Sequence, residues 1–252
     1  MSGNREPKTR REARRSRKKE RKRGGGLRMF FGILLILIAV GLLALDPIKN
    51  YIIEQGSTQN AVGNLTREQI ETNQSVDVTY DWGDINTLNA REVLASGVNP
   101  SDLPTIGGIA MPELGMNLPI YKGVSNEGMF YGAGTLYPDQ EMGVSNYSLA
   151  SHHSINDGLL FEPLMRAEIG QTIYLTDLEN IYVYQVDYID TVPATAVEVT
   201  YPTEEGRVTL ITCDTGLIDR VVVQGALVDT VSVDDASPEM LQAFDIAQTI
   251  TS

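Results

Sequence analysis

The 252-residue sequence has few of the side chains that carry most metal and redox chemistry. It contains one cysteine, Cys213, and two histidines, His152 and His153. A single cysteine cannot form an internal disulfide, so the fold must be stabilised by its core. One cysteine and two adjacent histidines do not complete a tetrahedral zinc shell without carboxylates. The sequence also lacks a glycine-rich phosphate loop, CxxC, HExxH and EF-hand spacing. We expect no cofactor.

Basic residues are scarce after residue 28. Residues 1–28 carry a net charge of +10, whereas residues 29–252 carry −23, with seven Lys and Arg against 30 acidic residues. So acidic a region is repelled by nucleic acid and by anionic lipid. A basic tail alone is often typical of nucleic-acid binding, but here an apolar run follows it directly. We therefore expect no nucleic-acid partner.

The apolar run covers residues 29–45, which include no charged side chain in 17 positions. A bilayer core of about 30 Å needs roughly 17–25 such residues as a helix. The basic residues before it place 1–28 in the cytoplasm by the positive-inside rule. The alternative is a cleaved signal peptide, whose apolar region is shorter, about 7–15 residues. We favour an uncleaved, single-pass transmembrane signal anchor, which makes the lipid bilayer a partner.

The chain after the anchor divides into two parts. Residues 46–79 are polar with scattered Ile and Val, which is typical of a juxtamembrane stalk. We expect this stalk to be mobile, with some helix near 48–53. Residues 80–252 are predicted to form one extracellular domain, entered by a short helix over 84–95.

Strands and turns dominate from Pro104 onward. Predicted strands with few helices and no βαβ alternation indicate a mainly β fold, an antiparallel or mixed β-barrel of about eight strands. Gly107 and Gly108 predict close packing or a bulge. Ser237 and Pro238 predict the start of a closing helix. The predicted strands cover 106–111, 117–122, 146–152, 171–176, 181–192, 208–213 and 221–233. We expect a glycine-rich loop with a turn of helix over 126–136, a short helix over 158–167 and a long loop over 193–206.

A predicted hairpin brings the lone cysteine to an arginine. The strand 208–213 ends at Cys213, a turn containing Gly216 follows, and the next strand begins beside Arg220. Paired strand ends lie roughly 5 Å apart. A cation at that distance favours the thiolate, which is the nucleophilic form of cysteine. The alternative is a buried structural cysteine beside an unrelated surface arginine.

The two histidines end the predicted strand 146–152. Adjacent strand residues point to opposite faces, so only one ring is expected to approach Cys213. His152 shares its face with the small residues Ala150 and Ser148, which would leave room for a substrate in a groove. This favours His152 over His153. The alternative is a pair of solvated loop histidines.

These motifs together resemble a known family. Leu-Ala-Ser-His-His at 149–153, Thr-Leu-Ile-Thr-Cys at 209–213 and Arg220, behind an N-terminal anchor, resemble a class A sortase. The segments 132–135, 158–161 and 173–177 also resemble streptococcal-type housekeeping members. The resemblance covers residues 80–252. It implies an eight-stranded sortase barrel, and an activity as a membrane-anchored cysteine transpeptidase of Gram-positive bacteria.

The resemblance also implies roles, substrates and partners. Cys213 takes the position of the nucleophile, His152 that of the general acid/base, and Arg220 that of the arginine that holds the oxyanion or the substrate backbone. The substrates would be surface proteins with a Leu-Pro-x-Thr-Gly signal, and the acceptor an amine of a lipid-linked peptidoglycan precursor. Substrate contacts are expected from the 193–206 loop and the strand ends, namely Val197, Val199, Ala150, Ser151 and Thr212.

Some features of the family are missing or different. Some class A relatives bind calcium through clustered carboxylates; Asp139 and Glu141 do not reproduce that cluster, so we expect no metal requirement. A pilin-type enzyme would carry an Asp-Pro-aromatic lid, but Ile48 follows Asp46 and Pro47. Two alternatives stay open on the sequence alone. One is a sortase-like peptidase that passes the acyl group to water, and the other is a membrane-tethered, non-catalytic peptide-binding barrel.

Overall fold

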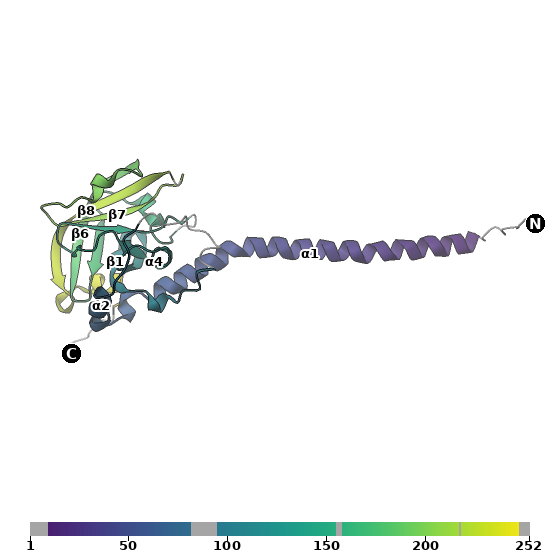
Figure 1. Ribbon diagram of the computed structural model, residues 1–252, viewed down its shortest axis with the longest axis horizontal. Coiled ribbons are helices and arrows are strands. Elements are labelled where there is room, and N and C mark those ends of the chain that lie inside the picture. Colours follow the sequence, from purple (N-terminus) through teal and green to yellow (C-terminus); the bar gives the residue numbers. More distant parts are fainter. Residues whose placement is uncertain (1–9, 82–94, 155–157, 217, 247–252) are drawn as a thin grey trace, which may run out of the picture. The chain divides into compact units, whose positions relative to one another are not determined.

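The computed structural model describes residues 10–81, 95–154, 158–216 and 218–246. The chain divides into two compact units, Met1–Ile48 and Lys49–Ser252. The long helix α1, Arg10–Gln59, begins in the first unit and ends in the second (Figure 1). Its part from Arg28 onward is long and apolar enough to cross a membrane.

The second unit is built on a closed eight-stranded barrel with the strand order β1-β2-β3-β4-β7-β8-β6-β5, closed by β5 pairing with β1. The pairs β2–β3 and β4–β7 are parallel, and the other pairs are antiparallel. Strands β6, β7 and β8 form one wall (Figure 1). This confirms the predicted mainly β barrel. The strands are β1 Thr105–Met111, β2 Met116–Tyr121, β3 Ala133–Thr135, β4 Asn146–Ala150, β5 Thr172–Thr176, β6 Asn180–Pro193, β7 Arg207–Cys213 and β8 Asp219–Ser232.

Short helices connect and cover the strands. Helix α2 begins with a capping box in which Thr66 and Gln69 exchange hydrogen bonds. The predicted cap at Ser237 is confirmed, because its hydroxyl accepts a hydrogen bond from the Met240 N–H at 3.3 Å. The helices are α2 Arg67–Gln74, α4 Asn126–Tyr131 and α5 Pro238–Ala243, with 3-10 turns at η1 Val62–Asn64, η2 Pro100–Asp102, η3 Pro112–Leu114, η4 Glu162–Arg166, η5 Val197–Thr200 and η6 Val233–Asp235.

The segment expected to be a mobile stalk is packed instead. The chain from Lys49 belongs to the same compact unit as the barrel. Ile53, Val62 and Ile70 are each at most 1% exposed. The Asn60 amide donates to the Tyr121 hydroxyl at 3.0 Å. A few apolar residues suffice because each fills a site on the barrel, which composition alone did not reveal.

Glycines in β1 explain how this segment fits. The register of β1 shifts between Thr105 and Gly107, so the predicted bulge is present. A Cβ placed on Gly108 would lie 2.8 Å from a methyl group of Val62, which is too close for any larger residue. Gly108 therefore allows η1 to approach the barrel backbone, as the sequence predicted for close packing.

Three other local expectations differ from the structure. Strand β4 ends at Ala150, two residues earlier than expected. The helix expected within 158–167 is only the 3-10 turn η4, where Pro163 removes a backbone donor. The loop 193–206 contains the short turn η5. The helix expected over 84–95 lies almost entirely outside the described residues.

Alternation along β4, β7 and β8 separates an inner from an outer face. Tyr147, Leu149, Val208, Leu210 and Val223 belong to the large core cluster. The intervening residues lie on the opposite, outer face. On that face Ala150, Ile211 and Val222 form one row in register across the three strands. Outward-facing side chains of these strands build the candidate site.

Candidate active site

The cysteine and the arginine lie at the paired ends of two strands. Cys213 ends β7, and in the antiparallel register it is directly opposite Arg220 near the start of β8. Directly opposite residues have Cβ atoms about 4.5–5.5 Å apart. Cys213 is a free, partly exposed thiol. The hairpin predicted from the sequence therefore brings the thiol and the guanidinium together.

The turn between these residues is fixed by Asp214. Its carboxylate accepts hydrogen bonds from the N–H groups of Ile218 at 2.8 Å and Asp219 at 3.1 Å. Burial works against ionisation of Asp214, but backbone N–H donors and the nearby Arg220 outweigh it and lower its pKa. The carboxylate thus stays charged and holds the hairpin turn beside Cys213.

Parallel pairing of β4 with β7 brings the histidines to the same place. Ala150 pairs with Ile211, and the Ser151 N–H donates to the Ile211 carbonyl at 3.2 Å. The chain therefore leaves β4 alongside the last residues of β7. His152 and His153 follow directly, next to the end that carries Cys213.

The ring of His152 is buried and neutral. It stacks on Phe130 of α4 with ring centroids 5.4 Å apart and an interplanar angle of 28°. Burial lowers the pKa of His152 to about 4, because desolvation penalises the imidazolium. Its Nε2 is buried without a hydrogen-bond partner. A neutral imidazole with an unpartnered nitrogen can accept or pass a proton.

One groove of about 520 Å³ contains all of these groups. Its floor is the apolar row Ala150, Ile211 and Val222, and η5 with the residues before it forms a wall. The thiol, the guanidinium and both imidazoles lie along it. The lining residues are Met129, Leu136, Tyr137, Ala150, Ser151, His152, His153, Val192, Pro193, Ala194, Ala196, Val197, Val199, Thr200, Ile211, Thr212, Cys213, Arg220 and Val222.

The groove is lined by every residue predicted to be catalytic or substrate-binding, including Ala150, Ser151, Thr212, Val197 and Val199. Two of them differ in detail. The Ser151 hydroxyl is already used, since it donates to the Gly132 carbonyl at 2.6 Å. Both histidines line the groove, whereas strand alternation predicted only one. The alternation does not apply to them because β4 ends at Ala150.

Sequence reasoning missed part of the groove. Ile211 and Val222 complete the apolar floor, and the cross-strand register of the cysteine hairpin could have identified Val222. Phe130 was not expected to contact a histidine, because 126–136 was interpreted as a loop with a turn of helix. Ser125, which accepts from the Gly128 N–H at 3.0 Å, was the available signal for α4.

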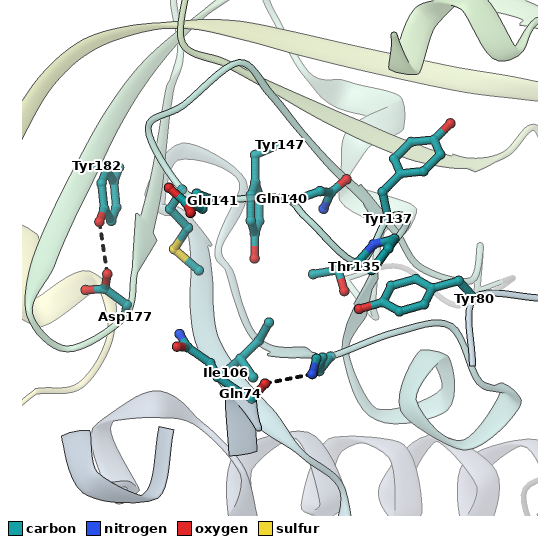
Figure 2. Close-up of a pocket in the computed structure, with 13 residues that line it drawn as sticks. Gln74, Tyr80, Ile106, Thr135, Tyr137, Gln140, Glu141, Tyr147, Asp177 and Tyr182 are labelled. Atoms are coloured by element: carbon teal, nitrogen blue, oxygen red, sulfur yellow. Dashed lines mark hydrogen bonds between the residues drawn. The ribbon is translucent and has the colours of Figure 1, made fainter. Parts of the chain in front are cut away.

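A second cavity, of about 420 Å³, lies apart from the thiol (Figure 2). We call it the tyrosine cavity because Tyr80, Tyr137, Tyr147 and Tyr182 line it. Two of its charged side chains, Asp177 and Lys122, are bonded within the chain. The Tyr182 hydroxyl donates to Asp177 at 2.9 Å, and the Lys122 ammonium donates to the Gln74 carbonyl at 2.6 Å. This cavity therefore offers no group resembling the thiol and imidazole of the groove.

A nucleophile, a proton carrier and a fixed cation in one groove can perform acyl transfer through a covalent intermediate. Comparisons with known proteins agree. The sortase domain family matches residues 109–228. Sortase A of Streptococcus agalactiae serotype III is 34% identical over 225 residues, which cover 86% of this chain and 91% of that protein. Sortase A of Listeria monocytogenes is 36% identical over 202 residues, covering 79% and 91%.

The solved structure of Listeria monocytogenes sortase A superposes with a TM-score of 0.53 at 38% identity, covering 57% of this chain and 99% of that one. The chain therefore belongs to the sortase family. Within the family it is a class A sortase, and thus a transpeptidase.

Proposed function

We propose that this transpeptidase cleaves Leu-Pro-x-Thr-Gly sorting signals between Thr and Gly and joins the Thr carbonyl to an amine of a peptidoglycan precursor. The observation that supports this is the single groove in which Cys213, Arg220 and His152 meet. Sulfur attacks the Thr carbonyl carbon, and the C–N bond to glycine breaks to leave a thioester. The acceptor amine then attacks the thioester, forms a new amide and releases the thiol.

His152 carries the proton in both steps. Its lowered pKa, about 4, means that the ring is neutral at neutral pH. It must therefore first take the proton that it delivers to the departing glycine amine, and the Cys213 thiol is the source. In the second step the ring takes a proton from the incoming amine and returns it to sulfur.

Arg220 stabilises charge while these steps occur. The carbonyl oxygen becomes an oxyanion in each tetrahedral intermediate, and Arg220 with backbone N–H groups near Thr212 would hold it. One such donor is worth about 3–4 kcal/mol of transition-state stabilisation. The Arg220 guanidinium itself is fixed by a hydrogen bond to the Asp219 carbonyl at 3.1 Å.

The apolar floor and η5 would bind the Leu-Pro part of the signal. Ala150 contributes to the floor, and Val197, which is 55% exposed, with Val199 contributes to the wall. An exposed valine beside an apolar floor gains by being covered, at about 25 cal/mol per Å² of buried apolar surface. Ser151 would contribute through its backbone, because its hydroxyl is already bonded.

We also propose that residues 29–45 span the cell membrane, with 1–28 in the cytoplasm and the catalytic domain, 80–252, outside. Support comes from the apolar helix and from the charge of +10 before it against −23 after it. The test uses right-side-out membrane vesicles and an epitope at each end. External protease should digest the C-terminal epitope and spare the N-terminal one.

The function is tested by trapping the thioester. The full chain in detergent is incubated with a Leu-Pro-x-Thr-Gly peptide and analysed by mass spectrometry, with Cys213→Ala as the control. We expect an adduct on Cys213 equal to the peptide through Thr, and its conversion to a new amide when an amine is added. No adduct would favour a non-catalytic binding barrel, and hydrolysis that ignores the amine would favour a peptidase.

A further inference from the structure

One carbonyl on the groove wall is held by side chains from two barrel strands. The Val199 carbonyl accepts from the Asn146 amide at 3.0 Å and from the Gln224 amide at 2.9 Å. Asn146 begins β4 and Gln224 lies in β8. The same Asn146 amide also donates to the Tyr201 carbonyl at 3.0 Å. Both lone pairs of the Val199 carbonyl are thus used, which fixes the end of η5 to the barrel.

Thr209 orients both amides. Its hydroxyl donates to the Asn146 Oδ1 at 2.6 Å and accepts from the Gln224 Nε2 at 3.0 Å. With its oxygen bonded to Thr209, Asn146 must present its N–H groups to the loop. Thr209 is fully buried, and it is not among the residues that line the groove. It can therefore act on a bound peptide only through its neighbours.

The orientation of Gln224 is also set from its other side. Arg207 donates to the Gln224 Oε1 at 3.5 Å and is itself held by both Asp187 carboxylate oxygens, at 2.7 and 2.8 Å. Because a guanidinium can only donate, it favours the amide oxygen on its side and leaves the N–H groups facing the loop. Asp187 thus orients Arg207, Arg207 orients the Gln224 amide, and that amide donates to the Val199 carbonyl.

We propose that Asn146, Thr209 and Gln224 form a polar latch, which positions η5 over the apolar floor and so sets the affinity for the Leu-Pro part of the sorting signal. The identity of the bound peptide rests on the proposed function, whereas the hydrogen bonds of the latch do not depend on it. The polar row of Thr209 and Gln224 lies next to the apolar row of Ile211 and Val222 on the same strand faces. The latch therefore holds the wall at one end of the floor, away from the reacting sulfur. Its three members are positioning residues.

The sharpest test compares two substitutions at one site. Thr209→Val keeps the shape but removes the hydroxyl, and Thr209→Ser keeps the hydroxyl. We measure the Kd of a labelled Leu-Pro-x-Thr-Gly peptide with the full chain in detergent, in a Cys213→Ala background so that no acyl transfer intervenes. Thr209→Val should raise the Kd about tenfold, and Thr209→Ser less than about twofold, because each lost hydrogen bond weakens the wall several-fold.

A second readout follows the wall itself. Hydrogen–deuterium exchange over 194–206 should be faster in Thr209→Val than in Thr209→Ser, and KM rather than kcat should change when Cys213 is present. Thr230→Val is the matched control, since Thr230 is an exposed residue of the same strand as Gln224 that lies outside the network and the groove, and it should change neither readout. If Thr209→Val does not fold, Gln224→Met replaces it and should raise the Kd about threefold by removing one of the two donors.

The outcomes separate this proposal from the proposed function. Equal Kd values, or equal exchange rates, for Thr209→Val and Thr209→Ser overturn the latch even if the thioester forms. A chain that binds the peptide with a Thr209-dependent Kd but forms no thioester supports the latch and overturns the transpeptidase mechanism. A chain that binds no sorting peptide overturns both.

Discussion

The groove and the tyrosine cavity are similar in volume, about 520 and 420 Å³, but differ in how their polar atoms are bonded. In the described part of the chain four buried side-chain polar atoms have no partner, and three belong to groove residues: His152 Nε2, His153 Nδ1 and Thr212 Oγ1. None belongs to a residue of the tyrosine cavity. Each buried polar atom without a partner lowers the free energy of unfolding by about 1–3 kcal/mol. The unpartnered atoms are therefore concentrated in the groove, where acyl transfer needs groups that are free to bond the substrate.

The tyrosine cavity shows the opposite arrangement (Figure 2). Asp177 accepts from the N–H groups of Glu179 and Asn180 at 2.8 and 2.7 Å as well as from Tyr182. Gln140 is bonded through both ends of its amide to the backbone of Ser148. These bonds close turns and anchor a loop. Polar side chains that are bonded in this way stabilise the fold, so substitutions of Asp177, Tyr182 or Gln140 should affect stability rather than turnover.

The largest expected effect comes from the two histidines. His152→Ala should lower kcat/KM with a sorting peptide by about 10²–10⁴-fold, because a general acid/base is lost. His153→Ala should lower it by less than about tenfold. Steady-state kinetics with an amine acceptor measures both, and circular dichroism checks the fold. The reverse order would assign the proton transfer to His153.

Arg220→Lys should have the next largest effect. A point charge cannot reproduce the planar fork of donors, so kcat should fall about 10²–10³-fold. Arg67→Lys is the matched control, because Arg67 forms exposed ion pairs with Glu71 and Glu179 far from the thiol in sequence. Turnover of Arg220→Lys close to that of Arg67→Lys would contradict the role of Arg220.

Features of the groove could be predicted from the sequence when the residues that form them lie close together along the chain. The cysteine hairpin followed from local signals, since a strand, a glycine-containing turn and a second strand lie within 208–223. The pairing of β4 with β7 joins Ala150 to Ile211 across 61 positions, and no turn encodes it. The histidines could be placed beside Cys213 only by chemical logic and family resemblance. Contacts between distant elements decide the rest of the groove.

The former stalk and the latch show why composition failed elsewhere. Residues 46–79 are polar on average, yet Ile53, Val62 and Ile70 each occupy a buried site. In the sequence Asn146, Thr209 and Gln224 resemble ordinary polar strand residues. Their role depends on the Val199 carbonyl, which Asn146 and Gln224 bond, and on Thr209, which orients both amides. Neither the buried residues of 46–79 nor the three latch residues recur at a helical or strand spacing, so hydrophobic periodicity does not identify them.

Stability should depend on pH through His152. The folded ring binds its proton only near pH 4, whereas an unfolded histidine does so near its usual value of 6.5. Between these values the unfolded state binds more protons, so the free energy of unfolding falls as the pH decreases. The loss should be on the order of 3 kcal/mol. Urea unfolding of wild type and His152→Gln at pH 7 and 4.5 measures it; a constant difference between the two would contradict a buried neutral ring.

The smallest effect is expected in the tyrosine cavity. Burial raises the pKa of Tyr147, which is 2% exposed, and no hydrogen bond contributes to that shift. Tyr147→Phe should therefore change the free energy of unfolding by less than about 0.5 kcal/mol, whereas Tyr182→Phe, which breaks the bond to Asp177, should cost about 1 kcal/mol. Neither should alter kcat/KM by more than about twofold. A large kinetic effect of Tyr147→Phe would mean that its hydroxyl, like the unpartnered nitrogen of His152, serves the reaction, and the contrast between the two cavities would no longer hold.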